Sequence, residues 1–388
     1  MSDVRIIALA LTMAAVPLAS CGAQTPVESI AQNSGAFSVS EHGTFAEPWA
    51  AAFEPGTGIL FVTEKAGTIK FYNPATGTTG NVTGVPTVDY GGQGGLGDIA
   101  FGPDYATTKA IYLSWAEAGE GDTRGAVVGK GTLDCSAGMS CKIEGLDVIW
   151  RQTPKVTGRG HYSHRIIFSP DGQYMYIASG DRQKMQPAQE LSNNLGSIVR
   201  LTLDGEPTPG NPFADQGGVA SQIWSYGHRN ILGMQFDQQG RLWELEHGPR
   251  GGDELNLVEK GANYGWPIVS DGIHYDGDPI PDHSTRPEFA APAIQWTPVI
   301  APGNFIFYDG EMFPEWRGDA LIAGLKTQAV IRVSVEGEEA TEVARYDMGE
   351  RIRQIVQGPD DAIWVLEDTE NGRLLRLTPP SGPLAAGA

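Results

Sequence analysis

The sequence has few basic residues and few cysteines. Lys and Arg number 27 against 47 Asp and Glu, which gives a net charge of −20. This balance argues against a nucleic-acid partner, because phosphates require a basic footprint. No C-x-x-C-H motif occurs, and no G-x-G-x-x-G turn directly follows an expected strand. We therefore expect no haem and no nicotinamide cofactor.

Long apolar runs are also missing, and the run from Ile6 to Leu18 is too short to span a membrane. Arg5 precedes it and small residues follow, which indicates an export signal over residues 1–20. The sequence LASC is similar to a lipobox, which implies cleavage before Cys21 and acylation of its thiol; an ordinary signal peptide is the alternative. We expect a lipid-anchored protein of the periplasm or cell envelope. An Asp after the acylated Cys usually retains a lipoprotein at the inner membrane, and this chain has Gly22 there instead. We therefore expect the anchor to lie in the outer membrane.

The two remaining cysteines, Cys135 and Cys141, lie six residues apart in TLDCSAGMSC. In an exported chain this spacing favours a disulfide that closes a small loop. A zinc site would need further ligands close in sequence, and none lie beside them. We therefore expect a Cys135–Cys141 disulfide.

An apolar strand, a turn rich in Pro, Asp and Gly, and a second apolar strand recur along the chain, and long amphipathic helical windows are absent after residue 30. Six such hairpins begin at Phe53, Phe101, Phe168, Phe236, Phe307 and Gln357. The turn chemistry is that of hairpins, and radial repetition of this kind indicates an all-β, six-bladed β-propeller. A β-sandwich would not repeat the hairpin six times. We expect a flexible tether over residues 21–40 and one propeller domain over residues 41–380.

Polar motifs cluster beside these hairpins, as they would at one end of a propeller channel. The motifs, in chain order, are GGQGGLGDIAFGPDY, GRGHYSHRIIFSPDG, YGHRNILGMQF, EHGPRGGDELNLVEKGANYGWP, GLKTQAVIRV and GERIRQIVQGPDDAIWVLED. A histidine such as His161 has the ordinary pKa of a general base. Arg351 and Arg353 are two residues apart and face the same way in a strand, so near a channel they would need an anion.

With these motifs the chain resembles the soluble PQQ-dependent aldose sugar dehydrogenases, six-bladed propellers of the glucose/sorbosone dehydrogenase type, over roughly residues 41–378. The resemblance implies oxidation of the C1 hydroxyl of an aldose to the lactone, with electrons passed to an external quinone or cytochrome. It implies that His161 is the general base and that Gln93 contacts the substrate hydroxyl. Arg229 and Asn230 would bond the reactive quinone carbonyl of PQQ and stabilise developing negative charge.

The resemblance also implies the residues that hold the cofactors PQQ and Ca²⁺. Lys326, Arg351 and Arg353 would bind the PQQ carboxylates. The ligand sets for calcium are the backbone carbonyls of Gly248 and Pro249 for the ion bound to PQQ, and Glu254 with the Tyr264 carbonyl for a second ion. Calcium prefers such hard oxygen ligands.

Some positions depart from the family pattern. Gly160 replaces an acid found in some members, Ser197 replaces a common Lys, Val299 lies near a position that is often hydroxylated, and His164 replaces a small residue. Two alternatives stay open. One is a calcium-dependent propeller lactonase, which the cationic Lys326 and paired arginines oppose. The other is a non-catalytic surface propeller that binds a glycan or a partner.

Overall fold

β-Strands make up nearly all the regular structure, which confirms the predicted all-β class. The computed structural model describes residues 35–135 and 140–380, so Cys21, the predicted signal peptide and most of the tether lie outside the described residues. In the described part, the only α-helix is α1 (Tyr105–Thr108), and the 3₁₀ turns are Gln186–Gln189, Ala214–Gln216, Ala220–Gln222, His283–Thr285 and Pro314–Trp316. No helix there has the length and apolar character needed to cross a membrane.

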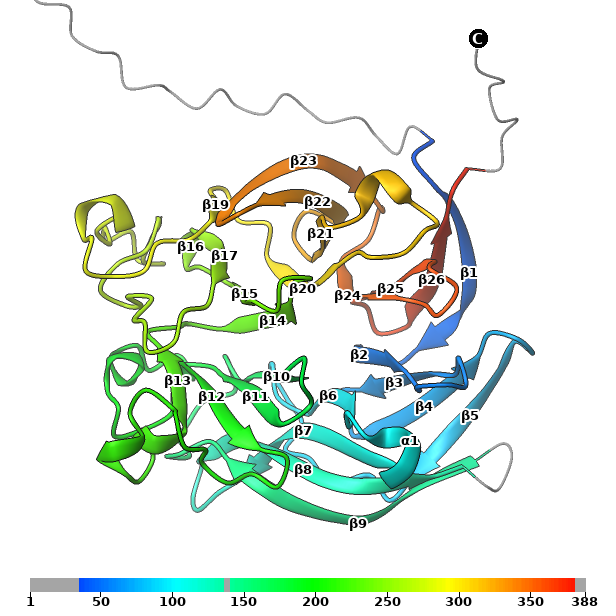
Figure 1. The fold of residues 1–388 in the computed structure, drawn as a ribbon, viewed down its shortest axis with the longest axis horizontal. Coiled ribbons are helices and arrows are strands. Elements are labelled where there is room, and N and C mark those ends of the chain that lie inside the picture. Colours follow the sequence, from blue (N-terminus) through cyan, green and yellow to red (C-terminus); the bar gives the residue numbers. More distant parts are fainter. Residues whose placement is uncertain (1–34, 136–139, 381–388) are drawn as a thin grey trace, which may run out of the picture. The chain divides into compact units, whose positions relative to one another are not determined.

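The described strands form five large sheets and one small sheet (Figure 1). The eight-stranded sheet has the order β2 (Pro48–Phe53), β3 (Leu60–Glu64), β4 (Thr68–Asn73), β5 (Thr78–Thr83), β9 (Ser140–Arg151), β8 (Arg124–Asp134), β7 (Ala110–Ala118), β6 (Leu96–Phe101). Its halves β2–β5 and β6–β9 are each antiparallel, and the parallel pair β5–β9 joins them.

Four further sheets have four antiparallel strands each. Their orders are β10 (Ser163–Phe168), β11 (Tyr174–Ser179), β12 (Ser197–Thr202), β13 (Ile223–Tyr226); β14 (Ile231–Phe236), β15 (Leu242–Glu246), β17 (Asp253–Leu257), β19 (Ile294–Trp296); β20 (Pro302–Phe307), β21 (Ala320–Gly324), β22 (Ala329–Glu336), β23 (Glu339–Asp347); and β1 (Ser38–Phe45), β26 (Gly372–Thr378), β25 (Ile363–Glu367), β24 (Ile352–Gln357). The small sheet pairs β16 (Arg250–Gly251) with β18 (Gly272–Ile273).

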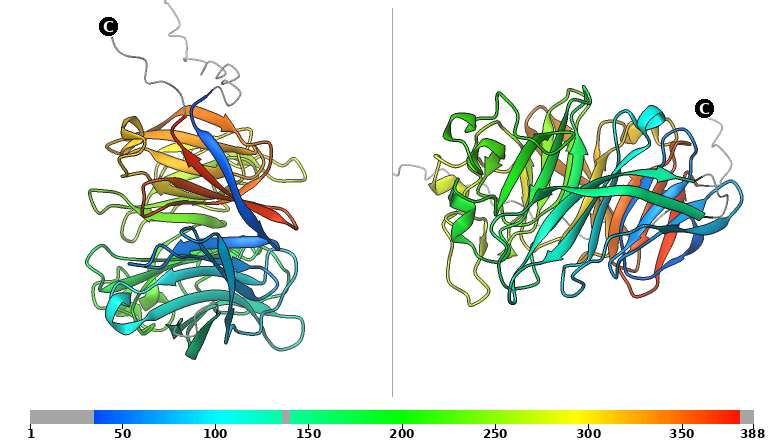
Figure 2. Two further views of the ribbon diagram at one scale, coloured as in Figure 1. Left: turned by 90° about the vertical axis from the view of Figure 1, so that its right-hand side faces the viewer. Right: turned by 90° about the horizontal axis from the view of Figure 1, so that it is seen from below.

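The first strands of these units contact one another in a closed cycle. Strand β2 contacts β6, β6 contacts β10, β10 contacts β14, β14 contacts β20, β20 contacts β24, and β24 contacts β2. The last sheet combines both ends of the described chain, because β1 pairs with β26 in the register Ser38↔Thr378 to Phe45↔Gly372. The two strands lie side by side in Figure 1, one blue and one red, and they lie together again in the left view of Figure 2. This pairing ties the N-terminal strand to the sheet formed by the C-terminal strands.

Each predicted hairpin is present and joins the first two strands of a sheet or half-sheet. The pairs are β2–β3, β6–β7, β10–β11, β14–β15, β20–β21 and β24–β25. In every pair the register shifts near the start of the first strand, for example between Ser163 and Ile166 and between Ile352 and Gln354. Such a β-bulge bends the strand and re-aims its side chains. The same irregularity therefore recurs near the start of the first strand of every sheet or half-sheet.

Apolar clusters fill the spaces between neighbouring sheets. One contains Tyr112 of β7, Trp150 of β9 and Ile177 of β11, and another joins Trp243 of β15 to Phe305 of β20. Because both faces of a sheet are covered, strands such as β3 and β21 are buried along their whole length. Full burial of a Leu- or Phe-sized side chain contributes about 1.5–3 kcal/mol, so these clusters hold the sheets together.

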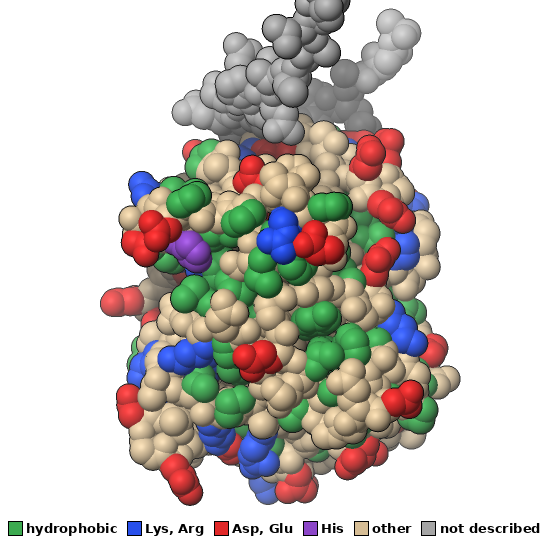
Figure 3. Space-filling view, turned by 90° about the vertical axis from the view of Figure 1, so that its left-hand side faces the viewer, with side chains coloured by type: hydrophobic (Ala, Val, Ile, Leu, Met, Phe, Trp, Pro, Cys, Tyr) green, Lys and Arg blue, Asp and Glu red, His purple; other side chains and the backbone are tan. Residues whose placement is uncertain are grey.

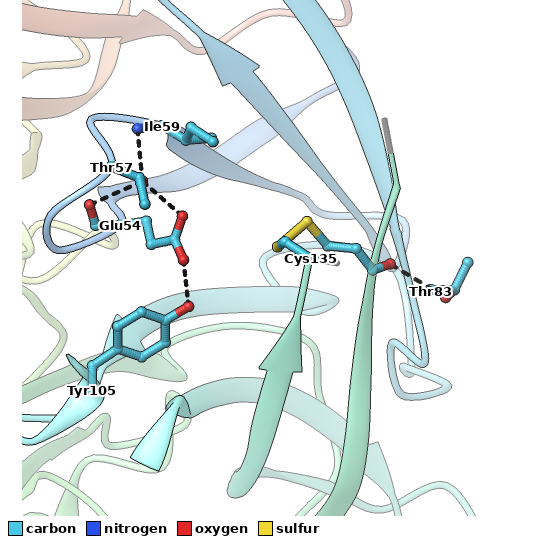
Figure 4. The surroundings of a disulfide bond; sticks show 7 residues. Glu54, Thr57, Ile59, Thr83, Tyr105 and Cys135 are labelled. Atoms are coloured by element: carbon cyan, nitrogen blue, oxygen red, sulfur yellow. Dashed lines mark hydrogen bonds between the residues drawn. A yellow bond between two sulfur atoms is a disulfide. The ribbon is translucent and has the colours of Figure 1, made fainter. Parts of the chain in front are cut away.

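The predicted disulfide is confirmed. Cys135 and Cys141 are bonded across the end of the β8–β9 hairpin, and Thr83 Oγ1 donates a hydrogen bond to the Cys141 carbonyl at 3.3 Å (Figure 4).

On the face shown in Figure 3, acidic and basic side chains are interspersed without a continuous patch of one sign. The excess of negative charge is thus not gathered on that face.

Candidate active site

A cavity of about 190 Å³ opens where the bulged first strands begin. Its lining residues are Trp49, Lys65, Gly92, Gln93, Tyr162, Ser163, His164, Asn230, Leu232, His247, Leu325, Arg351 and Arg353. Four residues predicted from the sequence, Gln93, Asn230, Arg351 and Arg353, therefore meet in one place although they come from distant parts of the chain. His247 also lines a smaller neighbouring cavity, together with Arg229 and Gly248.

His161 lies beside the larger cavity and is 6% exposed. Its backbone N–H donates to Gln93 Oε1 at 2.7 Å, and its Nδ1 lies 2.6 Å from Asp181 Oδ1. Nε2 has no hydrogen-bond partner among residues 35–135 and 140–380. Burial lowers the pKa of His161, the hydrogen bond to Asp181 opposes this shift, and the positive charges of Arg229 and Arg182 add to it. His161 is therefore a neutral imidazole, and its Nδ1–H bond to a carboxylate leaves Nε2 as the acceptor.

Asp181, which the sequence reasoning missed, fixes this tautomer. It is fully buried just after β11, where Oδ1 also accepts from Gln183 N at 2.7 Å. Oδ2 accepts from Trp266 Nε1 at 2.7 Å and from Met185 N at 3.3 Å. Burial alone would raise the pKa of Asp181, but the bonds with His161, Trp266 and Gln183 lower it below its ordinary value. The available signal was a carboxylate directly after a buried strand in SGDRQ.

Arg229 and Asn230 are held by one carboxylate. Glu246 Oε2 accepts both backbone N–H groups, at 2.6 Å and 3.1 Å. The Arg229 guanidinium donates to the His247 carbonyl at 3.0 Å and to the Tyr275 hydroxyl at 3.3 Å, while its buried Nε has no partner in the described part of the chain. Asn230 lines the larger cavity and Arg229 the smaller one. The pair therefore presents donors to two adjoining spaces.

Arg351 and Arg353 line the cavity side by side, as their spacing predicts, and share one anion. Arg351 Nη2 and Arg353 Nη2 each lie 2.8 Å from an oxygen of Asp368. Burial would raise the pKa of Asp368, but the two arginines hold it below its ordinary value. Lys65, which the sequence reasoning missed, adds a third cation to the lining. Lys326 is exposed and does not line the cavity.

The turn at Gly248 and Pro249 is buried. Among the described residues no hydrogen bond reaches either of its carbonyl oxygens, whereas the Gly248 N–H donates to Asp253 Oδ1 at 2.9 Å. Asp253 Oδ2 accepts from Ala301 N at 2.6 Å, so this side chain anchors the turn. Two carbonyl oxygens that accept no hydrogen bond from the described residues are free to act as ligands, and such oxygens suit a hard cation.

The second predicted ligand pair has a histidine between its members. His283 Nε2 lies 3.2 Å from the Tyr264 carbonyl, and Nδ1 lies 3.1 Å from Asp271 Oδ2 and 3.9 Å from Glu254 Oε1. Burial opposes protonation, yet Asp271 and Glu254 raise the pKa of His283 to about 9. A cationic ring thus already contacts both predicted ligands.

The positions that depart from the family pattern differ in their neighbours and in whether they line the cavity. A Cβ at Gly160 would lie 2.5 Å from the side-chain amide of Gln183, so this amide would have to move to admit a larger residue. Ser197 is buried with its hydroxyl unpartnered among the described residues, and neither it nor Val299 lines the cavity. His164 does line it.

Comparison with known proteins gives consistent matches. The family model described as glucose/sorbosone dehydrogenase matches residues 45–376. The chain is 39% identical over 339 residues to the aldose sugar dehydrogenase YliI of Escherichia coli, covering 86% of this chain and 90% of that protein. The crystal structure of the soluble aldose sugar dehydrogenase from E. coli in the apo-form has a TM-score of 0.82 at 37% identity and covers 88% and 99% of the two chains. The PQQ-bound aldose sugar dehydrogenase from Streptomyces coelicolor has a TM-score of 0.72 at 28% identity, covering 89% and 98%.

Proposed function

The chain belongs to the glucose/sorbosone dehydrogenase family, and on this premise we propose that it is a PQQ- and calcium-dependent aldose dehydrogenase. It oxidises the C1 hydroxyl of an aldose to the lactone and passes electrons to an external quinone or cytochrome. The observation that carries the proposal is a buried, neutral His161 whose Nε2 has no partner in the described part of the chain, beside a cavity lined by three cations.

PQQ, when bound, supplies a two-electron acceptor for the hydride that leaves C1. His161 Nε2 takes the proton of the C1 hydroxyl, and Asp181 stabilises the imidazolium that results. The side-chain oxygen of Gln93 holds the His161 backbone, so its amide N–H₂ stays available to position the sugar. Arg229 and Asn230 supply donors that stabilise negative charge as it develops in the site.

The cations of the cavity wall would hold the three carboxylates of PQQ. Arg351 and Arg353 are already fixed side by side through Asp368, which lowers the entropy lost when they grip an anion. We propose that Lys326 turns its exposed side chain toward the same carboxylates, because its neighbour Leu325 lines the cavity.

The carbonyls of Gly248 and Pro249 would bind the calcium ion that accompanies PQQ, where it acts as a Lewis acid. Glu254 and the Tyr264 carbonyl would bind a second calcium ion. Binding there requires the His283 ring to move, since that ring contacts both groups.

We further propose that the architecture is a six-bladed β-propeller. The closed cycle of β2, β6, β10, β14, β20 and β24 supports it, with β1 completing the last blade. The parallel β5–β9 pair then joins the outer edges of two neighbouring blades.

The N-terminal sequence supports export and a lipid anchor. Cleavage before Cys21 would leave an acylated cysteine, followed by a tether, at the outer membrane. Incorporation of labelled palmitate into the wild type but not into Cys21→Ser tests this, and equal labelling of both would refute it.

The experiment that tests the function is a PQQ titration of the purified apo-protein with calcium, followed by dye reduction with a panel of aldoses. We expect saturable activity that requires both PQQ and calcium. His161→Ala should bind PQQ normally and lose sugar-dependent turnover. PQQ binding without turnover of any aldose would contradict the sugar oxidation, and the absence of PQQ binding would contradict the enzyme altogether.

A further inference from the structure

His164, on the wall of the active-site cavity, has two buried ring nitrogens that find no hydrogen-bond partner in the described part of the chain. The residue is 2% exposed and lines the cavity. Neither Nδ1 nor Nε2 has a hydrogen-bond partner among residues 35–135 and 140–380. A buried polar group without a partner destabilises the protein unless a ligand satisfies it. His161, three residues earlier, uses its Nδ1 to bind Asp181, so the two histidines are in different states.

The surrounding residues hold the His164 ring firmly in place. The ring stacks on Tyr162 at 5.3 Å between centroids and meets Trp49 edge-on at 5.6 Å. Ser114 Oγ donates to the His164 carbonyl at 2.8 Å. A Cβ on Gly97 would lie 2.6 Å from His164 Cγ, so the glycine in strand β6 makes the space that the imidazole fills. A glycine weakens the interior of a strand. The space that the His164 ring requires accounts for the presence of Gly97 in β6.

The surroundings also keep the ring neutral. Burial lowers the pKa of His164 to about 3, and the positive charges of Arg182 and Arg165 act in the same direction. A neutral imidazole offers one N–H donor and one acceptor nitrogen. The ring therefore keeps unused hydrogen-bonding capacity at the cavity wall, just beneath its surface, without adding a fourth cation to Lys65, Arg351 and Arg353.

We propose that His164 is a further cofactor-contacting residue, whose ring N–H donates a hydrogen bond to an oxygen of the PQQ bound in this cavity. This inference rests on the proposed function. It follows from three observations: the ring lines the cavity, its nitrogens are unsatisfied, and Gly97 and Tyr162 fix its position. PQQ carries oxygen atoms that accept hydrogen bonds, and the neutral His164 ring can donate one beside the cations of the cavity wall.

The test compares PQQ affinity and apo-protein stability in His164→Phe, which keeps an aromatic ring and removes both nitrogens. We expect PQQ to bind about tenfold more weakly, the effect of one lost hydrogen bond. We also expect the melting temperature of the apo-protein to stay the same or rise, because two unsatisfied atoms are gone. Trp224→Phe is the control, since Trp224 Nε1 is also buried without a partner in the described region but does not line the cavity. It should leave PQQ affinity unchanged.

Unchanged PQQ affinity in His164→Phe would overturn the proposal, whether or not the melting temperature falls. A wild type that fails to bind PQQ would instead refute the proposed function, and this inference with it. Should His164→Phe not fold, the wild type still decides the question. The nitrogen-15 resonances of the His164 ring should shift when PQQ is added to the calcium-loaded protein, and unshifted resonances at saturating PQQ would overturn the proposal.

Discussion

Replacing Asp181 with Asn changes one buried acceptor group into a donor and an acceptor. Asp181 Oδ1 accepts from His161 Nδ1 and Gln183 N, and Oδ2 accepts from Trp266 Nε1 and Met185 N. The Asn amide must point its N–H₂ at one of these pairs. Toward Trp266 and Met185 it would face two fixed donors, and both would lose their partner.

Toward His161 and Gln183 the amide faces only one fixed donor, because the imidazole can move its proton to Nε2. One unsatisfied donor costs about 1–3 kcal/mol and two cost twice that, so this second orientation is favoured by about 1–3 kcal/mol. In that state His161 Nε2 carries the proton and cannot act as a base. Loss of general base catalysis lowers the rate by about 10²–10⁴-fold. We therefore expect kcat of Asp181→Asn to fall by at least about 10²-fold, with a modest loss of stability.

The assay is steady-state dye reduction with saturating PQQ, calcium and sugar, alongside PQQ binding and thermal unfolding. Asp181→Asn should bind PQQ normally while kcat falls. Asp204→Asn is the control, because its side chain is 79% exposed and it contacts Lys130 away from the cavity. A kcat within twofold of the wild type for Asp181→Asn would refute the tautomer argument.

Three further predictions follow from the structure. Because the pKa of His161 is lowered, the neutral base persists to more acidic pH, and the acidic limb of a kcat/KM profile should lie below 6.5; a limb at or above that value would contradict the assignment. Arg351→Ala with Arg353→Ala should weaken PQQ affinity by at least about tenfold in a calorimetric titration, since charge-assisted bonds are lost, and unchanged affinity would remove their role. Cys135→Ser with Cys141→Ser should lower the free energy of unfolding in urea by about 2 kcal/mol, the effect expected for a loop this short, without changing sugar turnover.

The sequence was informative wherever local chemistry decides the structure. Turn residues and strand pattern located all the hairpins. The motifs placed Gln93 and His161 in one site although they are 68 residues apart, and a 2.7 Å hydrogen bond joins them. The spacing of Arg351 and Arg353 predicted that both face one space, and both line the cavity.

The sequence was uninformative where a role depends on a distant partner. Asp181 is one of many acids until the fold brings its oxygens to His161. Lys326 belongs to the motif, but its side chain direction is set by the turn, and it is exposed. Nothing in the local pattern shows that His283 reaches Glu254 and Tyr264, because the contacts join the turn at His283 to strand β17 and to the segment that follows this strand.

One guanidinium joins the strands that lie beside the site. Buried Arg165 in β10 bonds Asp98 of β6, the Leu232 carbonyl of β14, the Gly303 carbonyl of β20 and Gln354 of β24. Gln354 in turn donates to the Ala51 carbonyl of β2, so the network reaches the first strand of every unit in the cycle. Arg165 lines a further cavity of about 270 Å³, separate from the two cavities of the site, while its neighbour His164 lines the active-site cavity. The hydrogen bonds of Arg165 and Gln354 thus fix the first strands against one another beside the active-site cavity, which preorganises the site before any ligand binds.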